Sequence, residues 1–362
     1  MILELLFLLI VLIQLFFYFL FGSFTCSKFQ KHTPQDIPIS VIICAKNEAH
    51  NLADFLPSIL HQIYTNFEIV LVNDHSTDKT LELMLSFKGK YNSIKVVNLV
   101  NEDSTGNKKH AITQGIKAAT YEHLLFTDAD CKPNSEYWIK EMSAFFSNDK
   151  SIILGYGAYQ KKNTWLNKLI RFETLLTAIQ YFSYAKIGLP YMGVGRNLAY
   201  TKSQFYAANG FANHKHIKSG DDDLFINQVA TKKNTAICFS SKSFTVSKPN
   251  TTFKKWMHQK RRHITTATSY KPIHQFLLGL FYSSQLLFWC FAILLSFTSK
   301  NWQFIVLLFS IRIIVQYLIF GFTAKKLNEK DLFSYIPFME LFLIIIQMYL
   351  FIFNLFHKPK TW

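Results

Sequence analysis

Cysteine is scarce in this chain of 362 residues, and its five cysteines are scattered without paired spacing. Zinc sites and disulfide frameworks both use short, regular cysteine spacings, so the sequence favours neither. Each cysteine is therefore interpreted as a small buried hydrophobe, which fits a reduced, cytoplasmic compartment. Acidic residues are also few, with 23 against 39 basic ones, and the formal net charge is +16.

A basic excess suits nucleic acid, anionic lipid head groups or a phosphorylated substrate. The chain has no basic repeat, however, and its aromatic residues concentrate in long apolar runs. Half of its residues are hydrophobic, which is too apolar for an ordinary soluble protein. We therefore expect membrane lipids and a phosphorylated substrate as partners, and no nucleic acid.

Four apolar runs are long enough to cross a bilayer, which takes about 20 residues. Residues 2–21 form the first run, whose start lacks the basic residues of a signal peptide, so we expect a retained anchor over 1–24. The other three lie within a predicted transmembrane bundle over 274–357, at 276–297, 302–322 and 335–356. The runs predict a multi-pass cell-membrane protein, and because Lys28 and Lys31 follow the first run, the positive-inside rule places the domain that follows in the cytoplasm.

The last apolar run has two interpretations. The lysine-rich loop 323–334 is predicted to be cytoplasmic, which leaves Lys358 and Lys360 outside if the last run crosses fully. A re-entrant last segment would remove this conflict. Arg312 and Glu340 lie within the last two runs, where charges are costly and tend to face a bundle interior, so they could pair with each other.

Residues 36–270 form the predicted globular domain. Short apolar runs predict strands at 39–44, 67–72, 94–99 and 123–126, and apolar residues at helical spacing predict helices at 48–62, 81–87 and 108–119. This alternation predicts an α/β domain with a mainly parallel sheet and helices on both faces. The later segment 165–184 is amphipathic and could be a core helix or lie on the membrane surface.

Asp128 and Asp130 follow the strand predicted at 123–126. Asp is a poor strand former, so both carboxylates are expected at an edge of the sheet, where ligands bind in open α/β folds. Two hard oxygen ligands suit Mg²⁺ or Mn²⁺ held together with substrate phosphates. The alternative is a solvated turn, because Asp-x-Asp is common by itself.

A second acidic cluster consists of Asp221, Asp222 and Asp223. Three adjacent carboxylates repel one another, and partial burial raises the pKa of at least one of them. A raised pKa suits a general base. The alternative is an acidic helix start, which the helix dipole favours.

Three motifs together resemble the nucleotide-binding half of family 2 glycosyltransferases. They are SVIICAKNE at 40–48, FEIVLVNDHSTD at 67–78 and TDAD at 127–130. The resemblance covers about residues 37–265 and implies a GT-A fold. It also implies a metal-dependent, inverting transfer of a hexose or N-acetylhexosamine from a nucleotide sugar, in first place a UDP-sugar, to a glycan or lipid acceptor.

The resemblance also assigns roles to individual residues. The metal would bind Asp128 and Asp130. Asp222 would be the general base with Asp221 as its partner, in a register that is open by one residue. The donor site would comprise Ala45, Asn47, Glu48, Asp74, Lys108, Asp128, Gly195, Asn197, Gln259 and Arg262.

Two of these assignments have physical alternatives. Asp74 and Asp78 both follow a strand. A carboxylate there can accept a hydrogen bond from a base or a ribose, or it can cap the next helix. We assign Asp74 to the nucleotide and Asp78 to the cap. Gln259 and Arg262 match the Gln-x-x-Arg-Trp motif of membrane-embedded members, with His263 in place of the Trp. The alternative for this stretch is a basic cluster that binds anionic lipid.

The resemblance leaves the type of transfer open. A processive β-glycan synthase and a single-transfer glycolipid synthase both fit, although the few spans and the missing Trp weaken the first. A different class is an export or scaffold membrane subunit with an inactive glycosyltransferase domain. The intact Asp74, Asp128, Asp130 and Asp222 argue against that class.

Overall fold

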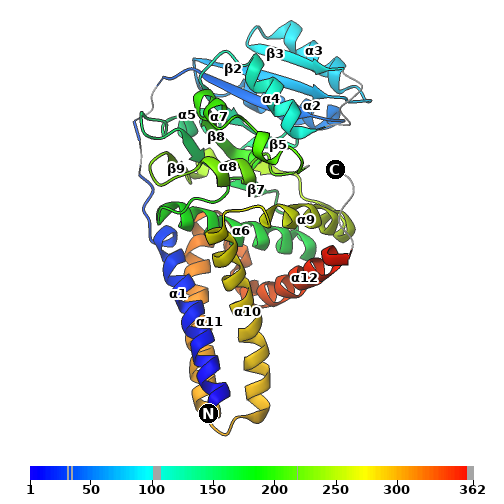
Figure 1. Cartoon of the computed structure of the whole chain (residues 1–362). Coiled ribbons are helices and arrows are strands. Elements are labelled where there is room, and N and C mark those ends of the chain that lie inside the picture. Colours follow the sequence, from blue (N-terminus) through cyan, green and yellow to red (C-terminus); the bar gives the residue numbers. More distant parts are fainter. Residues whose placement is uncertain (31, 34–35, 101–106, 218, 357–362) are drawn as a thin grey trace. The chain divides into compact units, whose positions relative to one another are not determined.

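The computed structural model describes residues 1–30, 32–33, 36–100, 107–217 and 219–356 (Figure 1). The chain divides into two compact units, each of which is described by itself. The first contains Met1–Lys28, Lys161–Ile187 and the described residues from Asn250 onward, and the second contains Phe29–Gln160 and Gly188–Pro249. Two segments of the predicted domain 36–270 therefore pack with the apolar helices.

A seven-stranded sheet with the order β3-β2-β1-β4-β8-β6-β9 forms the centre of the second unit. Four strands, β1 to β4, pair in parallel as predicted, whereas β8 runs antiparallel to both β4 and β6. The result is a mostly parallel α/β sheet. The bounds are β1 (Ile39–Ala45), β2 (Phe67–Asp74), β3 (Ile94–Leu99), β4 (His123–Phe126), β6 (Ile152–Leu154), β8 (Leu198–Thr201) and β9 (Thr235–Ile237).

A smaller sheet extends the second unit beyond the end of β4. It consists of β5 (Cys131–Pro133), β10 (Thr245–Ser247) and β7 (Gly157–Tyr159), in that order. Because β5 begins only five residues after β4 ends, the turn that carries Asp128 and Asp130 is held between two sheets. Both of its flanks are therefore anchored by strand pairing.

Helices cover both faces of the large sheet because alternate strand residues point to opposite sides. One face packs on α2 (Ala49–Leu60), α3 (Thr80–Lys90) and α5 (Trp138–Ser143) through a buried apolar cluster. The other face carries α4 (Lys108–Ala118) and α8 (Asp223–Val229). Gly115 of α4 lies so close to the sheet that an added Cβ would be 2.9 Å from Ile42 and 3.0 Å from Val72. This close packing fixes α4, and with it Lys108, over the centre of the sheet.

The first unit is built around three long apolar helices that lie side by side (Figure 1), namely α1 (Ile2–Thr25), α10 (Pro272–Thr298) and α11 (Trp302–Lys326). At one end of α1, Glu4 accepts from Ser299 and Asn301 in the turn between α10 and α11. At the other end, the Lys326 ammonium donates to the carbonyls of Phe24, Thr25 and Ser27 at 2.6–2.9 Å.

Four helices of the described chain are long and apolar enough to cross a membrane, one N-terminal and three C-terminal. This agrees with the predicted runs. The remaining helices of the unit are α6 (Trp165–Lys186), α9 (Phe253–Ala267), η4 (Lys330–Tyr335) and α12 (Ile336–Phe356). The ring of Phe182 in α6 lies 4.8 Å from that of Phe24, and the ring of Phe172 lies 5.8 Å from that of Phe320. These contacts favour the core-helix interpretation of the segment 165–184.

Arg312 and Glu340 form the expected pair, with 2.6 Å between Nη2 and Oε1, and both side chains are fully buried. Four polar side chains complete the cluster. Gln285 and Trp289 donate to Glu340 at 2.7 and 3.2 Å, and Gln14 and Gln316 accept from Arg312 at 3.1 and 2.7 Å. All four long apolar helices contribute to this network. The pair is therefore the polar centre of the apolar unit.

The path of η4 and α12 favours the re-entrant interpretation of the last segment. The ring of Phe333 in η4 lies 5.0 Å from Tyr317, so the chain turns back along α11. Glu340 meets Arg312, which lies 14 residues before Lys326 and so roughly 20 Å along the helix. Asn354 then accepts from Arg261 of α9, the helix that precedes α10. Figure 1 shows α12 inclined steeply to α1, α10 and α11 rather than parallel to them.

We predict that Glu340→Ala destabilises the protein by about 3–5 kcal/mol, because it leaves the Arg312 guanidinium buried without its counter-charge. Thermal unfolding in detergent measures this loss. The matched control is Arg312→Met with Glu340→Met, which removes both charges and should lose less stability than Glu340→Ala, because only neutral polar groups are left without partners. Equal losses in the single and double variants would contradict the role of the pair.

Candidate functional site

The carboxyl ends of β1, β2 and β4 meet at one edge of the sheet, as the sequence predicted. Ala45 ends β1 and pairs with Asn73 of β2, and Asp74 is the last residue of β2. The backbone N–H of Thr127 donates to the carbonyl of Ile42, which keeps the chain after β4 beside β1. The site is therefore built on three neighbouring parallel strands.

The loops after β1 and β2 are bound to each other. The Asn47 side chain accepts from the backbone N–H of Thr77 at 2.8 Å, and the Asn47 N–H donates to the Ser76 hydroxyl at 2.9 Å. Asn47 has φ 57°, a left-handed conformation that Asn tolerates. Glu48 donates its N–H to Thr80 at 2.8 Å. These contacts fix the loop that carries the predicted donor-binding residues.

Asp74 is buried at the end of β2 and pairs with His75, with 2.9 Å between Oδ1 and Nδ1. Asp78 instead accepts from the backbone N–H of Thr80 at 3.0 Å, at the start of α3. This geometry agrees with the interpretation of Asp78 as a helix cap. Burial raises the pKa of the Glu48 carboxyl, which accepts from Asn51 at 2.6 Å.

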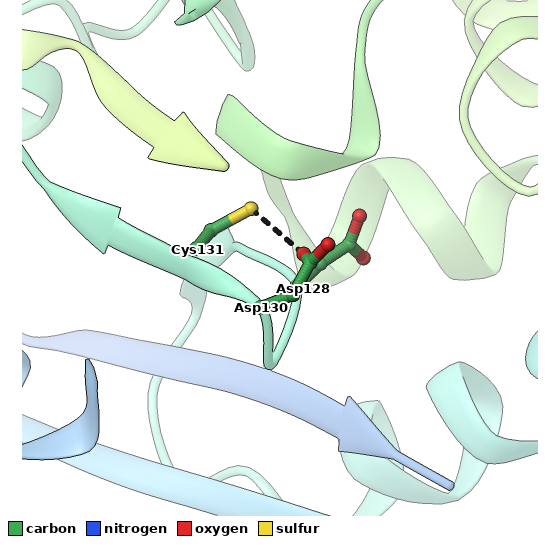
Figure 2. A group of neighbouring side chains, drawn as sticks. All are labelled: Asp128, Asp130 and Cys131. Atoms are coloured by element: carbon green, nitrogen blue, oxygen red, sulfur yellow. Dashed lines mark hydrogen bonds between the residues drawn. The ribbon is translucent and has the colours of Figure 1, made fainter. Parts of the chain in front are cut away.

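Asp128 and Asp130 lie side by side on the turn between β4 and β5, and the Cys131 thiol reaches Asp130 at 3.2 Å (Figure 2). One ligand atom from each of the three residues lies within 4.8 Å of the others. Burial and the neighbouring Asp128 raise the pKa of Asp130. Burial also raises the pKa of Cys131 far above its usual range, so its thiol stays protonated. The hard ligands at this turn are therefore the two carboxylates.

Lys108 connects the two acidic clusters. Its ammonium lies 2.9 Å from Asp128 Oδ1 and 3.2 Å from Asp221 Oδ2. Burial alone would raise the pKa of Asp128, but the Lys108 charge outweighs it and holds this pKa below its ordinary value. The same carboxylates outweigh burial at Lys108 and raise its pKa well above its usual range. Lys108 is thus permanently charged and bound to carboxylates.

Asp222 occupies the other side of the cluster. Its Oδ2 accepts from the backbone N–H of Gly195 at 2.7 Å, and its Oδ1 accepts from that of Asp223 at 2.8 Å. Gly195 suits this close approach because a Cβ there would be 3.3 Å from the Asp222 carboxylate. Burial, followed by the charges of Asp221 and Asp223, raises the pKa of Asp222 to about 7. This value suits proton transfer near neutral pH.

The side chain of Asn197, a predicted donor-binding residue, does not face the site. It is fully buried, accepts from Trp138 Nε1 at 3.0 Å and donates to the carbonyls of Tyr156 and Ser243. Every polar atom of this amide is thus used to join the sheet to its neighbours. Its neighbour Arg196, which the sequence reasoning passed over, contributes positive charge near Asp128 and Asp130. Gly195, which directly precedes Arg196, was the feature of the sequence that could have pointed to it.

Gln259 and Arg262 lie on α9 in the first unit, so their contribution to the donor site stays a prediction. Gln259 accepts from Asn250 at 2.8 Å. Lys260 pairs with Glu173 at 2.7 Å, and Arg261 donates to Asn354 at 3.0 Å. These two basic residues therefore have protein partners, which weakens the lipid-binding interpretation for them.

We predict that kcat/KM rises with pH through a midpoint near 7, because Asp222 accepts a proton only when it is ionised. Below this midpoint kcat/KM should fall about tenfold per pH unit. A pH–rate profile from pH 5 to 9 measures it. In Asp222→Asn, the fall of kcat/KM below pH 7 should disappear, whereas the exposed control Asp149→Asn should keep it. A wild-type midpoint near 4 would contradict the raised pKa of Asp222.

Comparison with known proteins finds related sequences and a similar fold. Residues 40–211 match the family model Glycosyl transferase family 2. The poly-beta-1,6-N-acetyl-D-glucosamine synthase of Staphylococcus epidermidis is 31% identical over 136 residues, which is 37% of this chain and 32% of that protein. The synthase of the same name from Staphylococcus aureus is 28% identical over 148 residues, 39% of this chain and 34% of that protein. The matched segments thus span about a third of these curated relatives.

A solved structure has a similar fold over most of the chain. It is a mannosyltransferase from Pyrobaculum calidifontis in complex with GDP-Man and Mn²⁺, with a TM-score of 0.59 and 15% identity over 94% of this chain and 99% of that one. At this identity the likeness concerns the fold alone. Together with the match of residues 40–211 to the family 2 model, it supports a GT-A-like architecture, and the chain is similar to family 2 glycosyltransferases over those residues.

Proposed function

We propose that this protein is a membrane-bound, inverting glycosyltransferase. Its donor would be a nucleotide sugar, in first place a UDP-sugar, and its acceptor a glycan or a lipid. One observation carries the proposal. Asp222, a half-buried carboxyl with a pKa of about 7, lies beside a lysine that also binds the Asp-x-Asp turn at the ligand-binding edge of the sheet. A general base and a diphosphate site are thus combined in one cluster.

The chemistry follows from the positions of these groups. Asp222 would take the proton of an acceptor hydroxyl, whose oxygen then forms a bond to the anomeric carbon. The bond from that carbon to the diphosphate breaks on the opposite face, and the nucleoside diphosphate leaves with the electron pair. Attack from the face opposite the leaving group inverts the anomeric carbon, so an α-linked donor gives a β-linked product. Gly195 orients the base through its N–H.

A divalent cation fits the Asp-x-Asp turn. Asp128 and Asp130 offer oxygen ligands, and the raised pKa of Asp130 indicates negative charge that Lys108 does not fully balance. Mg²⁺ or Mn²⁺, when bound, would neutralise charge on the leaving diphosphate. Asp74 would bind the nucleoside, since its buried carboxylate ends the neighbouring strand. The names of the curated relatives support an N-acetylhexosamine donor and a polysaccharide acceptor.

A donor panel tests this proposal. Purified protein is incubated with UDP-N-acetylglucosamine, UDP-glucose and GDP-mannose in Mn²⁺, with and without EDTA, and release of the nucleoside diphosphate is measured. Asp222→Asn should lower kcat by about 10²–10⁴ and leave UDP affinity unchanged, whereas Asp74→Asn should weaken UDP binding. If Asp223→Asn has the full effect instead of Asp222→Asn, the base is one residue away. Normal turnover in all variants would favour the export or scaffold interpretation.

We also propose that the catalytic unit is cytoplasmic and that the last segment is re-entrant. In a cysteine-free background, a cysteine at Ser299 should react with an impermeant reagent added outside intact cells, because Ser299 lies in the turn between α10 and α11. Cysteines at Asn92 and at position 361 should both stay protected. Labelling at Asn92 would mean that the catalytic unit lies outside the cell. Labelling at both Ser299 and position 361, with Asn92 protected, would mean that the last segment crosses the membrane fully.

A further inference from the structure

Lys109 is a buried lysine at the start of α4, next to the active-site residue Lys108. Its side chain is only 3% exposed, and lysine is almost never buried to this extent without partners. Its ammonium donates to the His214 carbonyl and the Ile217 carbonyl at 2.8 and 2.9 Å and contacts His214 Nδ1 at 2.8 Å. The three N–H groups of the ammonium are thus matched by three acceptors.

The segment that Lys109 holds leads directly to the acidic cluster. His214 ends a short helical turn, Ala212–His214, only seven residues before Asp221. The ring of Phe211 lies 5.8 Å from that of His214 and 5.7 Å from that of Phe225 in α8, so the segment also packs on the helix that follows the cluster. The segment is therefore in contact with the helix whose start carries the acidic cluster.

Two consecutive lysines of α4 hold this segment from two sides. Lys108 binds Asp221 in the site, and Lys109 binds backbone carbonyls and His214 behind it. The hydrogen bonds of Lys109 go to backbone carbonyls and His214, and its charge alone acts on Asp221, Asp222 and Asp223, whereas Lys108 pairs directly with Asp221. Burial lowers the pKa of Lys109 to about 8 and that of His214 to about 4, so the imidazole is neutral and can accept.

We infer that Lys109 is a positioning residue, which anchors the segment 212–217 on α4 and thereby sets the orientation of Asp222 toward the acceptor. This inference rests on the proposed function, because it gives Lys109 a role in the rate of the transfer. Arginine would not replace it well, since a planar fork cannot direct three N–H groups to this set of acceptors.

The test compares Lys109→Met, which keeps the apolar stem and removes the ammonium, with Lys117→Met at an exposed lysine of the same helix. In Lys109→Met, kcat should fall by about 10²-fold, because a small misplacement of a catalytic group has this effect. UDP affinity should stay within about twofold, since Asp74 lies on another loop. Lys117→Met should match wild type throughout.

Hydrogen exchange gives a readout that does not depend on activity. Amides of 212–224 should exchange faster in Lys109→Met, while those of β1 and β2 stay protected. Unchanged exchange in 212–224, or faster exchange throughout the domain, overturns the inference. If Lys109→Met does not fold, His214→Ala, which keeps the carbonyl contacts, should produce the same local effect in weaker form, and its absence overturns the inference. If wild type binds UDP but transfers nothing, the proposed function fails, and the exchange data still decide whether Lys109 anchors the segment.

Discussion

The contact of Lys108 with Asp128 and Asp221 is the interaction on which the site depends. It joins a turn after β4 to the start of α8, two elements that are far apart in the sequence. Without this ammonium, the half-buried Asp128, the buried Asp221 and their acidic neighbours would repel one another at short distance. The close packing of Gly115 against the sheet holds α4 in place, so the lysine is delivered by a rigid helix. The charge balance of the site is therefore built into the packing of the fold.

The residues at strand ends could be predicted from the sequence, because a buried apolar strand that stops at Asp74 or Asp128 brings its polar successors to one edge of a parallel sheet. Asp78 as a cap could also be predicted, since its partner is two residues away. The role of Asn197 could not, because its three partners come from separate parts of the chain. The burial of Lys109 was hidden for the same reason, with His214 lying 105 residues away.

In the apolar unit, too, only part of the structure could be predicted from the sequence. The pairing of Arg312 with Glu340 could be anticipated, because charges in apolar runs need a partner. The direction of α12 could not, since its composition suits a full span and a re-entrant segment equally well. The contact of Phe333 in η4 with α11 and that of Asn354 near the end of α12 with α9 favour a re-entrant segment, which stays a proposal.

The two units treat buried charge in opposite ways, and the difference bears on function. Arg312 and Glu340 form a neutral pair surrounded by amides and an indole, which suits an apolar surrounding. The acidic clusters at the sheet edge instead contain five aspartates from positions 128 to 223, against the nearby charges of Lys108 and Arg196. A nucleotide sugar is itself an anion and would be repelled by this excess. If the proposed function holds, donor binding and a divalent cation at Asp128 and Asp130 would be linked by charge balance, so that each would strengthen the binding of the other.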